Sequence, residues 1–156
     1  MLDGITIELL SEHPEALAVL ARWFEAEWPS WYGVGRRGDA ATDLLSYASP
    51  HGLPRAVVAF ANGTLCGVAA LKATSIASHD HLTPWVAAGL VDPSQRRAGI
   101  GSQLISALER EAQSLGYRRI YCGTSTARSL LERSGWELME EISHEGEALG
   151  VYSKAL

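Results

Sequence analysis

The spacing of hydrophobic positions changes several times along the chain, and each change marks a new element. Residues 5–9 alternate apolar and polar side chains, as a half-exposed strand does. After Pro14, apolar side chains recur three and four residues apart, which predicts a helix with one buried face, at Leu17, Leu20, Phe24 and Trp28. A second, shorter helix is predicted over residues 39–48, because Pro50 and Gly52 end the pattern there.

The next pattern is that of a β-hairpin followed by a buried strand. Two apolar runs, 56–61 and 65–74, flank the pair Asn62-Gly63, which readily adopts the positive φ angles of a type I′ turn. After a polar loop, residues 85–91 are almost continuously apolar. Such a run favours a central strand that is covered on both faces.

Helix and strand patterns alternate again in the second half of the chain. Apolar side chains recur at helical spacing after residue 100, at Leu104, Ile105, Leu108, Ala112 and Leu115. Gly116 stands where a left-handed C-cap is expected. A strand over 118–122, a helix over 126–134 and two strands over 136–143 and 148–152 complete the series. The order β-α-α-β-β-β-α-β-α-β-β predicts a mixed α/β sheet in one domain over residues 1–156.

Composition agrees with one globular domain and argues against two classes of partner. The 156 residues are 47% hydrophobic and 20% charged, which is enough apolar material for a single core. A formal net charge of −5 argues against nucleic acid and anionic membranes, and no apolar stretch reaches the length of a membrane span. Cys66 and Cys122 fall inside predicted strands. We therefore expect two buried thiols in a reducing cytoplasm, not a disulfide or a metal pair.

The most specific local pattern is a strand that ends in a glycine-containing turn and opens into a helix. Residues 90–102 read LVDPSQRRAGIGS. The first N–H groups of such a helix lack intrahelical partners and bind phosphate, and Arg96 and Arg97 beside the turn favour a diphosphate. A Walker A loop would need a Gly-Lys pair, which the sequence lacks, and a dinucleotide fingerprint would need Gly or Ala in place of Leu104. The alternative is that the two glycines only shape a tight turn.

The spacing Arg96-x-x-Gly99-x-Gly101 resembles the signature of the GCN5-related N-acetyltransferase (GNAT) family, where it holds the pyrophosphate of acetyl-coenzyme A (acetyl-CoA). The resemblance implies the acyl-CoA N-acyltransferase fold, a mixed, mostly antiparallel central sheet with splayed parallel central strands and flanking helices. Pantetheine would insert between these two parallel strands where they diverge. Gly89 is the expected site of the splay, because a glycine inside a strand marks a bulge or a close approach. The implied cofactor contacts, with no metal, are Leu90, Val91, Arg96, Arg97, Ala98, Gly99, Ile100, Gly101 and Ser102.

The resemblance also implies an activity. Residues 83–87, TPWVA, ahead of Val91-Asp92-Pro93 resemble a bacterial subgroup whose acceptors are poorly defined. The expected function is acetyl-CoA-dependent transfer of an acetyl group directly to a primary amine of a small molecule or peptide. The alternatives are a non-catalytic acyl-CoA-binding or sensing module of the same fold and a nucleotide-binding protein. A homodimer through residues 136–152 is a further expectation.

The reaction needs a neutral amine. An alkylamine has a pKa near 10.4, so its deprotonation at neutral pH costs roughly 4–5 kcal/mol and a base is expected. Many family members carry a glutamate on the strand before the turn, but residues 85–91 contain no acid. The candidates are Asp80 and His81 ahead of that strand, followed by Glu25 and Glu27. The pair His79-x-His81 lacks a third metal ligand at a sensible spacing, so a metal site is not predicted.

Two further roles follow from the resemblance. The family commonly has a tyrosine at the position of Leu131, where it protonates the leaving thiolate, and Tyr152 is the candidate to replace it. The region after the first helix usually shapes the acceptor pocket. There, an acidic and aromatic wall for an ammonium group would consist of Glu27, Trp28, Trp31 and Tyr32. The alternative is that these aromatic side chains pack the helix junction against the sheet.

Overall fold

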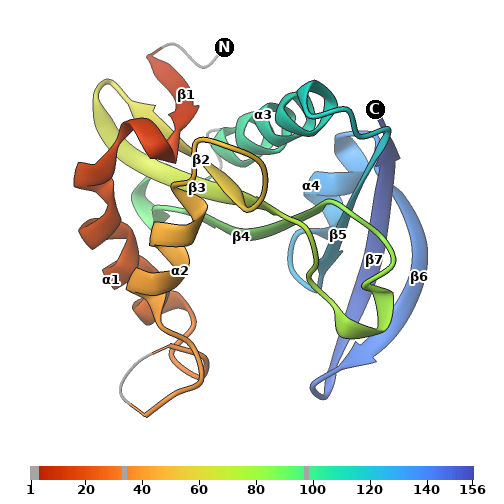
Figure 1. Ribbon diagram of the computed structural model, residues 1–156. Helices are drawn as coiled ribbons and strands as arrows, with labels where there is room; N and C mark the ends of the chain where they lie inside the picture. The colour runs from red at the N-terminus through yellow and green to blue at the C-terminus, as the bar shows by residue number, and fades with distance from the viewer. Residues whose placement is uncertain (1–3, 33–34, 97–98) are drawn as a thin grey trace.

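The computed structural model describes residues 4–32, 35–96 and 99–156, and within them seven strands form one sheet (Figure 1). The strand order is β1-β2-β3-β4-β5-β7-β6. The strands are β1 (Ile5–Leu9), β2 (Arg55–Ala61), β3 (Thr64–Lys72), β4 (Trp85–Val91), β5 (Arg119–Thr124), β6 (Glu137–His144) and β7 (Glu147–Ala155). The α-helices are α1 (Leu17–Glu27), α2 (Ala40–Tyr47), α3 (Ile100–Ser114) and α4 (Arg128–Arg133). The predicted element order is confirmed.

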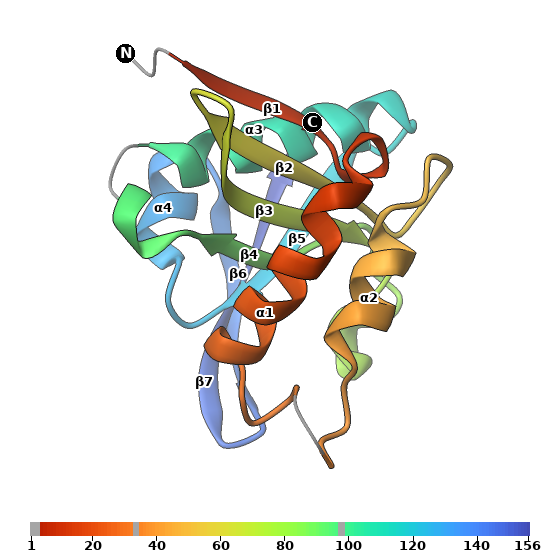
Figure 2. The same cartoon turned by 90° about the vertical axis from the view of Figure 1, so that its left-hand side faces the viewer.

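Helices cover both faces of the sheet. α1 and α2 lie together on one face, in front of the strands in Figure 2, and α3 and α4 lie on the other. A hydrophobic core lies on each face of the sheet, because successive side chains along β2 point to opposite faces. Val57 packs with the buried side chains of α3, and the adjacent Val58 packs with Leu20 and Leu44 of α1 and α2. The sheet is therefore central, as its apolar strands predict.

The one parallel pair in the described sheet is β4 with β5, and all its other strand pairs are antiparallel. This pairing lasts for two positions only, Trp85 with Tyr121 and Val86 with Cys122. Beyond Val86 the two strands diverge. The mixed, mostly antiparallel sheet with splayed parallel central strands is thus confirmed.

A bulge in β4 lies just beyond the point of divergence. Val68 of β3 pairs with Leu90 and Ala70 pairs with Ala87, so two residues of β4 lie opposite one residue of β3. Gly89 belongs to this bulge, as its place inside a strand predicts. The left-handed conformation, however, falls on the preceding residue, Ala88, with φ of 55°.

The predicted ends of several elements are wrong by a few residues. The last strand continues to Ala155, three residues beyond the prediction, and two short 3-10 turns precede α1. β6 is an edge strand of the sheet and exposes Leu138 and Met139, so pairing with a second copy through this edge stays a prediction. Both cysteines are free and buried, which confirms the predicted thiols.

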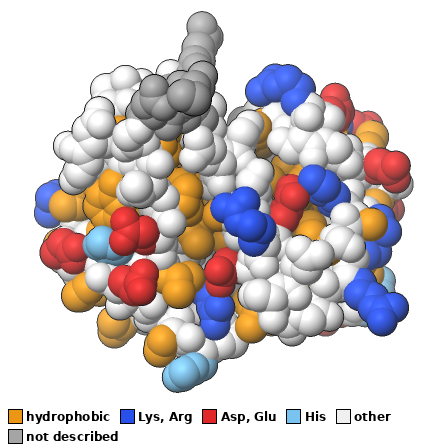
Figure 3. All heavy atoms as spheres, turned by 90° about the horizontal axis from the view of Figure 1, so that it is seen from above, with side chains coloured by type: hydrophobic (Ala, Val, Ile, Leu, Met, Phe, Trp, Pro, Cys, Tyr) orange, Lys and Arg blue, Asp and Glu red, His pale blue; other side chains and the backbone are white. Residues whose placement is uncertain are grey.

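The face of the molecule seen from above carries charges of both signs. Figure 3 shows basic and acidic side chains interspersed with hydrophobic ones on the face seen from above. In the described parts of the chain, no helix combines the length and the apolar character that a membrane crossing requires.

Candidate active site

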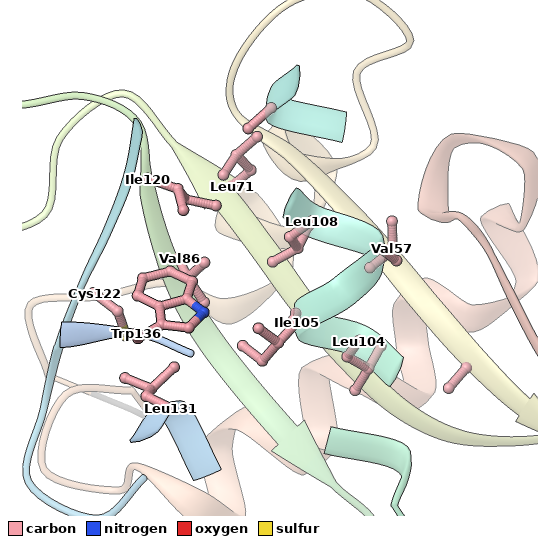
Figure 4. Close-up of a cluster of buried hydrophobic side chains, with 14 of the residues drawn as sticks. Val57, Leu71, Val86, Leu104, Ile105, Leu108, Ile120, Cys122, Leu131 and Trp136 are labelled. Carbon is pink, nitrogen blue, oxygen red and sulfur yellow. The ribbon is translucent and has the colours of Figure 1, made fainter. Parts of the chain in front are cut away.

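The divergence of β4 from β5 opens a cavity of about 790 Å³. Its floor is apolar, with Val86, Cys122 and Leu131 lying between the two strands and α4 (Figure 4). The backbone of β4 beyond Val86 has no strand partner on the β5 side. An extended ligand that carries amide groups can therefore hydrogen-bond along this edge, as an added strand would.

One end of the cavity is formed by the start of α3. Gly99 is the N-cap of this helix, with φ of 79°, and it provides no side-chain cap. The Gln103 N–H donates to the Gly99 carbonyl at 3.2 Å. The N–H groups of residues 100–102 come before this first turn closes, so they have no intrahelical partner. Gly101 and Ser102 line the cavity. This end can bind an anionic group.

Arg96 adds a positive charge at the same end and joins three parts of the site. Its Nε donates to the Val91 carbonyl at 3.0 Å, and its guanidinium lies 3.4 Å from the Glu27 carboxylate at the end of α1. All three residues line the cavity. Because Arg96 and Glu27 are about half exposed, this ion pair is weak, and an incoming diphosphate would compete for Arg96.

Most of the expected cofactor contacts meet at this cavity. Those that line it are Leu90, Val91, Arg96, Gly99, Ile100, Gly101 and Ser102. Arg97 and Ala98, which complete the predicted set, lie outside the described residues.

The structure places two of the four expected acceptor residues at the cavity and the other two away from it. Glu27 and Trp28 line the cavity, whereas Trp31 and Tyr32 do not. Tyr32 is buried and donates its hydroxyl to Asp43 at 2.7 Å, and burial raises the pKa of this phenol. Trp31 is partly exposed and lies under the Arg37 guanidinium, 4.3 Å from the ring centroid. The packing alternative thus describes Tyr32 better than a substrate contact does.

The three candidate catalytic residues are not brought to the cavity. Asp80 and His81 are exposed in the loop before β4, which the hydrogen bond between His79 and Glu140 ties to β6. This loop lies at the end of β4 where the strand still pairs with β5, so the divergence opens away from it. Asp80 and His81 therefore do not line this cavity, and their catalytic role stays a prediction.

Tyr152 also lies away from the cavity surface. Its ring is fully buried in the hydrophobic core between α3 and the sheet, and its hydroxyl donates to Glu132 of α4 at 2.6 Å. That hydrogen bond is the main cause that raises the pKa of Tyr152. The structure thus does not place this hydroxyl at the cavity, and its role as a proton donor stays a prediction.

Sequence reasoning missed the wall that β5 and α4 contribute. Thr124, at the end of β5, accepts hydrogen bonds from the N–H groups of Thr126 and Ala127 and so shapes the approach to α4. Burial raises the pKa of the Cys122 thiol to about 12, which keeps it protonated and unreactive. The remaining missed wall residues from this region are Gly123, Leu130 and Arg133, and beside them lies Leu131, to which the family resemblance already pointed. A clue was available, because β5 was predicted to be parallel to β4 and adjacent to it.

No group of three or more metal-ligating side chains occurs in the described part of the chain. The polar groups that the cavity offers include the backbone at the start of α3, the Arg96 guanidinium and the Glu27 carboxylate.

Comparisons with known proteins agree with this geometry. The model of the acetyltransferase (GNAT) family matches residues 20–136. Comparison with curated proteins finds no significant match.

Solved structures with the same fold include several acetyltransferases. An aminoglycoside 6'-N-acetyltransferase complexed with coenzyme A has a TM-score of 0.77 at 18% identity, covering 97% of this chain and 96% of that chain. The aminoglycoside 6'-N-acetyltransferase from Enterococcus faecium has a TM-score of 0.75 at 18% identity, with the same coverage. A Salmonella typhimurium protein solved with its cofactor acetyl-CoA has a TM-score of 0.75 at 17% identity, covering 98% and 94%. The sequence resemblance and the fold are thereby confirmed.

Proposed function

Because the chain belongs to the acetyltransferase (GNAT) family, we propose that the cavity between β4 and β5 binds acetyl-CoA for transfer of its acetyl group to a primary amine of a small molecule or peptide. The observation that carries this proposal is the early divergence of β4 and β5 into a cavity that ends at the uncapped start of α3. A pantetheine arm fits the gap between the diverging strands, and a diphosphate fits the start of α3. Two of the similar structures contain coenzyme A or acetyl-CoA, which supports the same ligand here.

The residues present fit such a ligand. The N–H groups of residues 100–102 and the Arg96 guanidinium would hold the diphosphate, and the free edge of β4 at Leu90 and Val91 would hold the pantetheine amides. When bound, acetyl-CoA supplies an activated acyl group. A backbone N–H of β4 near Val91 would stabilise the negative charge that develops on the carbonyl oxygen as the amine attacks.

Glu27 is the acidic residue among the described residues that line the cavity. Its carboxylate is about half exposed, so it can attract an ammonium group and accept a proton directly or through water. Trp28 beside it offers an aromatic face to the cation. Two similar structures are aminoglycoside acetyltransferases, and this supports a small-molecule amine as the acceptor.

Leu131 supports a second candidate function, a non-catalytic acyl-CoA-binding module. Its hydrocarbon side chain lines the cavity where the family commonly has a proton donor. A thiol with a pKa near 8.5 is a fair leaving group without such a donor, so catalysis remains the preferred function. The test is release of free coenzyme A from acetyl-CoA with a panel of small amines and peptides. Release no faster than in buffer, together with tight binding of coenzyme A, would identify the binding module instead. Stronger thermal protection by ATP than by coenzyme A would overturn both.

A further inference from the structure

Thr124 is a buried polar residue in the wall of the cavity between β4 and β5. It is the last residue of β5 and lines the cavity, with 8% of its surface exposed. The last pair between the two strands is Val86 with Cys122, and it closes the cavity at that end (Figure 4). Thr124 comes two residues later, roughly 7 Å along β5. Its side chain therefore lies near the closed end of the cavity, on the strand that faces the unpaired edge of β4.

The Thr124 hydroxyl has one polar position left for a ligand. A hydroxyl offers two acceptor lone pairs and one O–H donor. The N–H groups of Thr126 and Ala127 donate to the Thr124 Oγ1 at 3.2 and 2.9 Å, which uses both lone pairs. Within residues 4–32, 35–96 and 99–156, the O–H of Thr124 donates no side-chain hydrogen bond. A buried donor of this kind calls for an acceptor, and a ligand in the cavity can supply one.

The two incoming hydrogen bonds also prepare this hydroxyl as a donor. They hold the oxygen against backbone groups just ahead of α4, so little side-chain freedom is lost when a ligand binds. They also polarise the O–H bond, since successive hydrogen bonds strengthen one another in an interior of low dielectric constant. The donor is thus oriented before the ligand arrives.

The sulfur end of the proposed ligand is the part that reaches Thr124. The diphosphate would lie at the start of α3 and the pantetheine amides along Leu90 and Val91, so the rest of the ligand would continue along β4 toward the closed end. Ala88, in the bulge of β4, is also two residues beyond the last pair, as Thr124 is on β5. The thioester would therefore lie between this bulge and Thr124.

We propose that the Thr124 hydroxyl donates a hydrogen bond to the sulfur of coenzyme A and stabilises the thiolate that leaves during acetyl transfer. The inference rests on the proposed function. The amine nitrogen forms its bond to the acyl carbon, the carbon–sulfur bond breaks, and the electron pair of that bond passes to sulfur. The amine proton passes to Glu27 or to water, and the thiolate takes a proton from solvent afterwards. The hydroxyl keeps its own proton, and its hydrogen bond strengthens as negative charge develops on sulfur.

Two other groups in the same wall are less suited to this role. The Cys122 thiol is a weak donor, and it is directed to the Gly123 carbonyl at 3.9 Å. The Thr126 side chain also lines the cavity, but this residue is exposed, so water competes for its hydroxyl. Leu131 of α4 has no donor at all. The buried hydroxyl of Thr124 is therefore the donor that this wall can present to sulfur.

The test is the pH at which bound coenzyme A forms its thiolate, followed by ultraviolet absorbance in complexes with the wild type and three variants. Thr124→Val keeps a branched side chain and lacks the hydroxyl, so the thiolate should form about one pH unit higher than in the wild type, since a hydrogen bond to a charged group contributes about tenfold. Thr124→Ser keeps the hydroxyl and should titrate near the wild type. Thr126→Val is the matched control and should also titrate as the wild type does. A loss of fold stability alone would not shift this titration.

Desulfo-coenzyme A, which lacks the thiol, provides a second measurement that needs only the wild type. Its affinity and that of coenzyme A are compared by calorimetry between about pH 7 and about pH 9.5, where the thiol titrates. Coenzyme A should gain affinity relative to desulfo-coenzyme A as the pH rises, because the bound thiolate is stabilised. No relative gain would overturn the inference even if Thr124→Val failed to fold.

The contrary outcomes are distinct from failure of the proposed function. An unchanged titration in Thr124→Val, or an equal shift in Thr126→Val, would overturn the contact with sulfur. If Thr124→Val weakened both ligands equally, the hydroxyl would contact the pantetheine instead, and the inference would again be wrong. Binding of neither ligand by the wild type would overturn the inference and the proposed function together.

Discussion

Replacing Gly101 with alanine should weaken the binding of coenzyme A and leave the stability of the fold almost unchanged. Gly101 lies in the first turn of α3 and lines the large cavity opposite Leu130 of α4. A Cβ at position 101 would lie 3.2 Å from Leu130 Cδ2, between the two helices. The added methyl group therefore narrows the passage in which the diphosphate approaches the backbone of α3.

The magnitudes separate the two effects. Alanine in a helix is favoured over glycine by up to about 1 kcal/mol, and the tight contact at 3.2 Å, which requires Leu130 to move by a few tenths of an ångström, offsets part of that gain. The free energy of unfolding should change by less than about 1 kcal/mol. A hydrogen bond between an N–H group and a charged phosphate contributes about 1.5–3 kcal/mol, so the loss of one weakens binding about tenfold or more.

Gly116→Ala is the matched control at the other end of the same helix. Gly116 has φ of 95°, and nothing lies within 4 Å of the added Cβ, so the cost is backbone strain of about 1–2 kcal/mol with no effect on the cavity. The two variants should differ in opposite ways. Gly101→Ala should lose affinity for coenzyme A in calorimetric titration, and Gly116→Ala should lose stability in urea denaturation. If Gly101→Ala binds coenzyme A as the wild type does, the start of α3 does not hold the diphosphate. If it loses stability and affinity in parallel, the glycine has a structural role only.

Two further variants test the site. Glu27→Gln should lower kcat/KM for the amine about tenfold, because it removes a charged partner of the ammonium group, and should leave the affinity for coenzyme A near the wild-type value. Glu25→Gln, on the exposed face of the same helix, is the control, and equal effects of the two would contradict the assignment. Burial raises the pKa of the Cys122 thiol to about 12, so the native state keeps a proton that the unfolded chain releases above about pH 8.5. The free energy of unfolding should therefore fall as pH rises from 9 toward 11, by at most about 1.4 kcal/mol per pH unit for this thiol. Urea denaturation of Cys122→Ala should show a shallower fall, and an unchanged slope would contradict the reasoning.

The start of α3 could be predicted from the sequence because its determinants are local. These determinants all lie close together in the sequence. They are a glycine that adopts positive φ, the helical spacing after residue 100 and an arginine before the turn. The hairpin turn at Asn62 and Gly63 was predictable for the same reason, and both residues have positive φ.

The far wall of the cavity could not be predicted in this way. Thr124 and Leu130 reach the cavity only because β5 pairs with β4 over two positions and α4 then follows. The extent of that pairing depends on the bulge at Ala88 and Gly89, whose left-handed residue is alanine, against its usual preference. Similarly, the sequence left Tyr32 open between an acceptor contact and packing at the helix junction, because its partner Asp43 lies eleven residues away.

Tyr152→Phe tests whether the protein itself protonates the leaving thiolate. The hydroxyl of Tyr152 donates to Glu132, and its ring is enclosed by the core that contains Leu131 and Cys122, so it has no surface in the cavity. The variant should unfold at a lower temperature, because Glu132 loses a hydrogen bond, while kcat falls far less than the about hundredfold loss that removal of a general acid produces. Turnover should keep rising with pH through the range in which the amine loses its proton, in the variant as in the wild type, because a thiolate leaves without assistance at high pH. A large fall in kcat at unchanged melting temperature, with loss in the variant of an alkaline limb that the wild-type pH profile shows, would instead show that Tyr152 donates the proton.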